Sequence, residues 1–283
     1  MAVAYQVRVS VPPESLDEAV SLLCRLSSHG FQELPAPRGV ELVCPVAERA
    51  LGETLTAALR AVPVLRGPII EKIVQEDWMA KWRAGMQPVL VCEDIWVSPK
   101  WLAPPDTDSG RWIKIEPRMA FGTGHHETTR LAAAATATSV RAHAGSPAVI
   151  DVGTGTGILS LVADRCGAGR SIGIDTDTTC LADMAENWRE NIPRAVSFAV
   201  AGCEALANAC GDIVVMNVLL AHSGPLVPHA RRLLRTGGTL IWSGLQNEER
   251  DRCVTIARDA GFGLTAESSE GEWWCGCFQR LDQ

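Results

Sequence analysis

The second half of the chain alternates apolar strand patterns with helical patterns, and this alternation restricts the fold more than any other feature. The central strands are apolar throughout, as in Ile213-Val-Val-Met216, which is typical of parallel strands covered by helices on both faces. Strands are predicted at 148–152, 171–175, 196–201, 212–218, 239–243, 264–268 and 273–280, and helices at 158–166, 178–191, 226–235 and 247–260. The last two strands have no helix between them, so an antiparallel hairpin is predicted there. We therefore predict a Rossmann-like α/β domain with a seven-stranded sheet over 111–283.

A different pattern precedes this domain. The first 75 residues predict the order strand, helix, strand, strand, helix, strand, which is typical of a small ferredoxin-like α+β sandwich. The predicted ranges are 5–11, 16–26, 31–34, 39–43, 47–61 and 68–75. Residues 76–110 are predicted to connect the two domains through a helix at 76–85, strands at 89–92 and 95–97, and a loop at 103–110. This first fold hosts many functions, so it predicts no chemistry by itself.

Charge and cysteine content exclude several classes of protein. The 283 residues hold 33 acidic and 26 basic side chains, a net charge of −7, which disfavours a protein that mainly binds nucleic-acid backbone. The ten cysteines are scattered from Cys24 to Cys277, unlike the disulfide framework of a short secreted chain. Cys275 and Cys277 lack a second pair, so no metal site is predicted. With no leader and no apolar run of membrane length, we predict a cytoplasmic protein.

The first strand of the α/β domain ends in a glycine-rich turn, Asp151-Val-Gly153-Thr-Gly155-Thr-Gly157. Such a turn lets the backbone approach a ligand at the crevice beyond the strand ends. The third glycine of a dinucleotide fingerprint is replaced by Ile158, and the Gly-Lys-Ser/Thr of a P-loop is missing. The spacing therefore favours a ligand without pyrophosphate, such as S-adenosylmethionine (SAM), while a tight strand-to-helix turn is the alternative.

Two polar residues at strand ends support a nucleoside ligand. Asp175 ends the second strand, eighteen residues after Gly157, where a carboxylate can accept hydrogen bonds from both ribose hydroxyls. Capping of the next helix is the alternative, but Asp177 and Thr178 suit that role better. Asn217 ends the strand at 212–218, and its carbonyl can accept from an amine and orient the nitrogen toward an electrophilic carbon. A turn-forming asparagine is the alternative here.

The segment Ile115-Glu-Pro-Arg-Met-Ala-Phe-Gly-Thr-Gly-His-His-Glu-Thr-Thr-Arg130 resembles the signature of the PrmA family, the methyltransferases of the large-subunit ribosomal protein numbered eleven. The resemblance extends over most of the chain. It includes Asp77-Trp78, Ile95-Trp-Val-Ser-Pro-Lys-Trp101, the glycine turn, Gly173-Ile-Asp175, Asn217-Val-Leu, Ser243-Gly244 and Glu272-Trp-Trp-Cys.

This resemblance implies a SAM-dependent protein methyltransferase that modifies lysine or N-terminal amino groups of a ribosomal protein. It implies that the N-terminal domain recognises the substrate and that Thr129, Gly153, Asp175 and Asn217 bind the cofactor. Asn217 is also our candidate for orienting the amine. His126 is a candidate proton relay, with holding of the loop backbone as the alternative. The predicted SAM-binding set is Phe121, Gly122, Thr123, Gly124, Thr129, Asp151, Gly153, Gly155, Gly157, Asp175 and Asn217.

The chain departs from the family pattern at two places close to the expected amine channel. His125 and Glu127 stand where the family usually has Thr and Pro, and Leu220-Ala-His222 stands where it usually has Ala-Gly-Pro. The predicted partner is a basic ribosomal protein free of its RNA, with no nucleic acid or membrane bound directly. The alternatives are the same chemistry on another protein lysine or small amine, and a catalytically silent SAM-binding interaction module.

Overall fold

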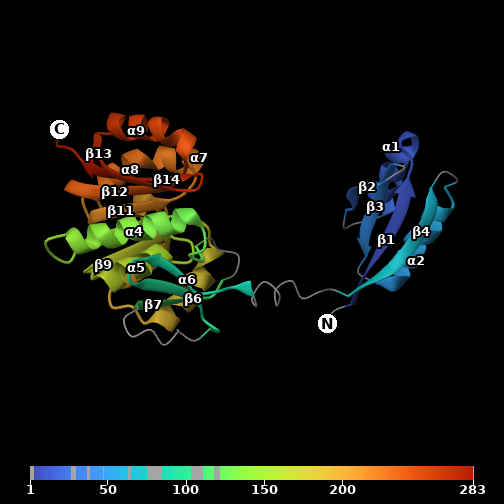
Figure 1. Ribbon diagram of the computed structural model, residues 1–283, viewed down its shortest axis with the longest axis horizontal. Coiled ribbons are helices and arrows are strands. Elements are labelled where there is room, and N and C mark those ends of the chain that lie inside the picture. The colour runs from blue at the N-terminus through green and yellow to red at the C-terminus, as the bar shows by residue number, and fades with distance from the viewer. Residues whose placement is uncertain are drawn as a thin grey trace. The chain divides into compact units, whose positions relative to one another are not determined.

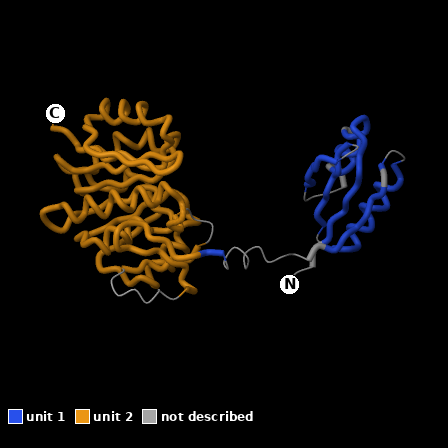
Figure 2. The backbone as a smooth tube through the Cα atoms, in the orientation of Figure 1, with its two compact units in different colours: residues 1–86 blue, residues 87–283 orange. Residues whose placement is uncertain are grey.

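A computed structural model describes residues 3–26, 30–36, 39–46, 48–62, 65–74, 85–102, 111–117 and 122–282. The chain divides into two compact units, Met1–Met86 and Gln87–Gln283 (Figure 2). The predicted helix at 76–85, apart from its last residue, and the predicted loop at 103–110 lie outside the described residues.

The first unit is an α+β sandwich with the element order predicted for residues 1–75. Its elements are β1 (Val3–Val11), α1 (Leu16–Leu26), β2 (Gln32–Ala36), β3 (Gly39–Val46), α2 (Arg49–Arg60) and β4 (Arg66–Val74) (Figure 1). The strands form one antiparallel sheet in the order β2-β3-β1-β4. Alternate residues of β1, Val7, Val9 and Val11, are buried together with Leu23 of α1 and Leu59 of α2. Alternate residues of a strand point to the same face of the sheet, so both helices cover the face to which these valines point.

The second unit is built on a seven-stranded sheet in the order β10-β9-β8-β11-β12-β14-β13. Its elements from residue 148 are β8 (Ala148–Val152), α5 (Ile158–Cys166), β9 (Arg170–Asp175), α6 (Cys180–Asn191), β10 (Val196–Val200), β11 (Gly211–Asn217), α7 (Leu220–Ser223), α8 (Val227–Leu233), β12 (Leu234–Gln246), α9 (Arg250–Asp259), β13 (Phe262–Glu270) and β14 (Trp273–Arg280). The first five strands in the order are parallel, and β13 and β14 form the antiparallel hairpin. The predicted α/β fold is confirmed.

Helices cover both faces of this sheet because neighbouring residues of each strand face opposite sides. Val149 and Val215 are buried in one core with α5, whereas Ile150 and Val214 are buried in the other core with α8 and α9. Both cores are apolar, as expected of a doubly wound sheet. Within the described residues, no helix has the length and apolar character needed to cross a membrane.

Two parts of the second unit differ from the sequence prediction. The strands β5 (Val89–Cys92) and β6 (Ile95–Pro99), which we expected in a connecting segment, form a small sheet with β7 (Arg111–Ile115). Their apolar residues join the core of the second unit. A sixteen-residue helix, α4 (Glu127–Ala142), was not predicted at all, and it packs on α5 and β12 (Figure 1). Its buried side is largely alanine and threonine, so it carries little hydrophobic periodicity.

Candidate functional site

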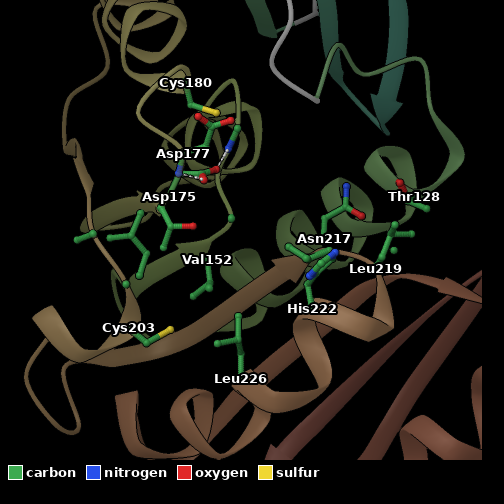
Figure 3. A pocket seen from close by; sticks show the side chains of 18 of the residues that line it. Thr128, Val152, Asp175, Asp177, Cys180, Cys203, Asn217, Leu219, His222 and Leu226 are labelled. Atoms are coloured by element: carbon green, nitrogen blue, oxygen red, sulfur yellow. Dashed lines mark hydrogen bonds between the residues drawn. The ribbon is translucent and has the colours of Figure 1, made fainter.

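A cavity of about 860 Å³ lies where the carboxyl ends of the parallel strands meet, within the size range of small-molecule sites (Figure 3). Residues at the ends of β8, β9 and β11 line it, namely Val152, Asp175 and Asn217. This is the crevice in which open α/β sheets bind ligands. The other lining residues are His126, Thr128, Gly153, Gly155, Ile174, Thr176, Asp177, Cys180, Ala201, Gly202, Cys203, Glu204, Val218, Leu219, His222, Leu226, Gly244 and Trp273.

The glycine turn brings its backbone to the cavity. Gly153 and Gly155 line the cavity, and both have positive φ, +71° and +54°. A Cβ on Gly153 would lie 2.6 Å from Cγ2 of Val218, so the close approach of these two loops requires glycine. Gly157 has a different role, because it caps α5 in the left-handed conformation and is not among the lining residues. The turn thus presents bare backbone at the edge of the sheet.

Asp151 lies beneath the turn instead of facing the cavity. It is completely buried, and its Oδ2 accepts hydrogen bonds from Oγ1 of Thr154 at 2.6 Å and from N and Oγ of Ser160 at 3.1 and 2.9 Å. Burial is the largest influence on its pKa and raises it from 3.8 to about 6, although these hydrogen bonds act in the opposite direction. Asp151 therefore connects the glycine-rich loop, through Thr154, to the N-terminal end of α5, through Ser160.

Asp175 ends β9 and faces the cavity. Its Oδ2 accepts from the backbone N of Gly155 and its Oδ1 from that of Asp177, both at 3.0 Å. Asp177 accepts from the backbone N of Thr179 at 2.8 Å, and this bond lowers the pKa of Asp177. The helix α6 begins three residues after Asp177, with Thr179 as N-cap, so Asp175 does not cap it. Asp175 is thus held as an acceptor at the cavity wall.

Asn217 is oriented by a residue of α4. Its Nδ2 donates to Oγ1 of Thr129 at 3.4 Å, and Thr129 is fully buried and does not line the cavity. Oδ1 of Asn217 is also buried, and it has no hydrogen-bond partner among the described residues. A buried acceptor without a partner is costly, and a ligand N–H at this wall would remove that cost.

The segment before α4 closes over the glycine turn. The Gly122 carbonyl accepts from Oγ1 of Thr156 at 2.6 Å, and Gly124, with φ +87°, fits against three valines of β5 and β6. Gly122, Gly124 and the half-buried Thr123 are not among the lining residues. The remaining member of this predicted group, Phe121, lies outside the described residues.

His126 joins this segment to the cavity. It is the N-cap of α4, because its Nδ1 accepts from the backbone N of Thr128 at 3.3 Å. Its ring lines the cavity and meets Trp273 edge to face, with ring centroids 5.0 Å apart. His126 thus holds the start of α4 in the structure, and its role as a proton relay stays a prediction.

The cavity also contains residues that the sequence reasoning did not select. Glu204 follows β10 at the same edge of the sheet as Asp175, and Gly244 approaches the backbone of Val218 so closely that a Cβ would lie 2.7 Å from its N. The signal for Glu204 was its position after a strand that ends at this edge, whereas Gly244 lies inside β12, beyond the range predicted for that strand. With Asp175, Asp177 and Glu204 in the lining and neither Lys nor Arg among the described lining residues, the charge suits a cation and not a pyrophosphate.

The chain is similar to known proteins. The family model described as ribosomal protein L11 methyltransferase (PrmA) matches residues 53–280. A ribosomal protein L11 methyltransferase of Clostridium perfringens (strain SM101 / Type A) is 32% identical over 205 residues, which is 72% of this chain and 64% of the relative. One of Gloeobacter violaceus is 36% identical over 207 residues, 72% of this chain and 63% of the relative. The chain thus spans a little under two thirds of the length of these curated relatives.

A solved structure is also similar. The ribosomal protein L11 methylase of Lactobacillus delbrueckii subsp. bulgaricus has a TM-score of 0.63 at 24% identity, covering 70% of this chain and 100% of that chain, which shows a shared fold. The family match extends over far more than half of the chain. This match, together with the sequence identity of 32–36% to these relatives, shows that the chain belongs to the ribosomal protein L11 methyltransferase (PrmA) family.

Proposed function

We propose that the chain is a SAM-dependent methyltransferase that modifies lysine or N-terminal amino groups of ribosomal protein L11. Membership of the PrmA family supports the reaction. The observation that carries the proposal is the cavity wall at Asn217, where a buried carbonyl oxygen has no hydrogen-bond partner among the described residues. A site built for an amine needs such an acceptor.

The residues at this edge fit SAM. Asp175 can accept hydrogen bonds from the ribose hydroxyls, while Gly153 and Gly155 let the backbone approach the ligand. Three acidic side chains suit the positive charge of a sulfonium and an ammonium group. The segment that would cover the methionine part contains Phe121, Gly122, Thr123 and Gly124. The lining residues are supported by three residues that do not face the cavity, Asp151, Gly157 and Thr129. SAM supplies an activated methyl group, so the protein needs no covalent nucleophile.

The protein must present the acceptor amine neutral and in line with the methyl group. An unperturbed lysine has a pKa near 10.4, so binding in the cavity must favour loss of its proton. Oδ1 of Asn217 can accept one N–H of the neutral amine, which directs the nitrogen lone pair away from the amide. Thr129 fixes the amide in the orientation that this requires.

The remaining parts of the chain fit a protein substrate. We assign substrate recognition to the N-terminal domain at 1–75, and we place the reaction in the cytoplasm, where ribosomal proteins are made. The net charge of −7 favours a basic ribosomal protein that has not yet bound its RNA. A second candidate is the same transfer to another protein lysine or a small amine. His222 supports it, because this side chain lines the cavity where the family usually has proline.

Mass spectrometry of the substrate tests the proposal. Purified L11 is incubated with SAM and the enzyme, and each methyl group adds about 14 Da to its intact mass. Asp175→Ala is the matched control, and it should bind SAM more weakly and transfer fewer methyl groups under the same conditions. An unmodified L11 in the presence of bound SAM would refute the L11 assignment. Labelled bands in a lysate with methyl-labelled SAM would then favour the second candidate.

A further inference from the structure

The proposed reaction requires a group that accepts a proton from the substrate ammonium, and this inference rests on that proposed function. His222 lies on the short helix α7, directly after the strand that carries Asn217. Both residues line the cavity, and Figure 3 shows both side chains at its far end from Asp175 and Asp177. His222 is exposed, so its ring has access to solvent water as well as to the cavity.

Other side chains of the cavity are less suited to this proton transfer. An amide such as that of Asn217 is not basic enough to hold a proton at neutral pH. Nδ1 of His126 is occupied as the N-cap of α4. Asp175 holds the backbone of Gly155 and Asp177. The titratable side chains that line the cavity besides His222 are His126, Asp175, Asp177, Cys180, Cys203 and Glu204.

We propose that His222 is the proton acceptor for the substrate amine. A ring nitrogen of neutral His222 forms an N–H bond as one N–H bond of the substrate ammonium breaks, and the electrons of that bond become the amine lone pair. The imidazolium then releases the proton to water from its exposed side. Imidazole suits this exchange because it changes charge between pH 5 and 8. The family usually has proline at this position, and proline has no side-chain group that could accept the proton. The proposed step is therefore specific to this chain.

The pH dependence of methyl transfer tests the role of His222. With His222→Gln, kcat/KM at pH 7 should fall by roughly 10²-fold, and the rising limb of the pH profile should move upward toward the range of the amine itself. The SAM dissociation constant should be unchanged. His229→Gln is the matched control, because His229 is an exposed histidine of α8 outside the cavity lining. An unchanged pH profile in His222→Gln would overturn the proposal.

A binding measurement keeps the inference separate from the proposed substrate. Sinefungin carries an ammonium group where SAM carries its methyl group, so it can be titrated calorimetrically without any transfer. Its affinity should rise by up to about tenfold from pH 5.5 to 7.5, because an imidazole can accept a hydrogen bond from an ammonium group only in its neutral form. His229→Gln should retain this rise and His222→Gln should lose it. Equal pH dependence in all three proteins would contradict the role of His222, even if L11 proves not to be the substrate.

Discussion

Asp151 offers a quantitative test of how the glycine turn is held. Its carboxyl group is completely buried, and one oxygen takes all three hydrogen bonds, from Thr154 and Ser160, while Oδ1 has no partner among the described residues. Burial disfavours the charged form, so the pKa is raised to about 6. Asp151→Asn removes the charge and keeps one oxygen for the same donors. The new amide nitrogen occupies the position of the unpartnered oxygen, which costs about 1–3 kcal/mol at every pH.

The sign of the pH effect follows from the direction of this shift. The folded protein holds the Asp151 proton more tightly than the unfolded chain does. The contribution of Asp151 to the free energy of unfolding is therefore greatest below its ordinary pKa of 3.8 and is lost as pH rises through about 6. The full difference corresponds to about 3 kcal/mol, of which about 2 kcal/mol falls between pH 4.5 and 7.5. Wild type should therefore lose about 2 kcal/mol relative to Asp151→Asn over this range.

Urea unfolding at several pH values measures this difference. The fluorescence of Trp242 and Trp274, both fully buried in the second unit, reports the unfolding of the part that holds Asp151. Asp177→Asn is the matched control: because the pKa of Asp177 is lowered from 3.8, its effect on stability changes below that pH, and the difference between wild type and this variant should stay nearly constant from pH 4.5 to 7.5. A constant difference between wild type and Asp151→Asn from pH 4.5 to 7.5 would refute the assignment of a raised pKa to Asp151.

Three further changes test the cavity wall. Asp175→Ala should weaken SAM binding by about 1–3 kcal/mol through lost ribose hydrogen bonds, and unchanged affinity in calorimetry would contradict this role. Gly244→Ala should destabilise the protein by about 2–4 kcal/mol in urea unfolding, since φ is +82° and the new Cβ would lie 2.7 Å from N of Val218. Gly145→Ala, with open space around it, is the control and should change little. Thr129→Val should lower kcat for methyl transfer more than it weakens SAM binding, because it frees the Asn217 amide; equal losses in both would argue against an orienting role.

The sequence was informative wherever hydrophobic patterns and strand ends were clear. The alternation from residue 147 onward predicted the parallel sheet, and the last two strands predicted the hairpin that the structure contains. Asp175 and Asn217 were selected because they end strands, and both line the cavity. These predictions depend on local patterns and on the rule that parallel strands end at one edge.

The helix α4 was missed because its burial depends on small residues. Ala132, Ala133 and Ala137 are buried in the core that contains Val149 and Val215, although alanine contributes little to a hydrophobic pattern. Its N-cap is a histidine, which is not one of the usual capping residues. Tertiary contacts identify this helix, and local sequence patterns do not. Because the helix was missed, the sequence also did not explain why Thr129 is buried or how Asn217 is oriented.

The different positions of Asp151 and Asn217 follow from one property of β-strands. Asp151 pairs with Val215, and both face the side of the sheet covered by α4 and α5, as Val149 does. Asp151 comes one residue before the end of β8, so α5 covers it. Asn217 shares the face of Val215 but ends β11, where its Nδ2 donates to Thr129 of α4 and the residue lines the cavity. Asn217 thus lies two residues farther toward the edge than Asp151 on the same face, and this difference separates a side chain that holds the turn from one that lines the cavity.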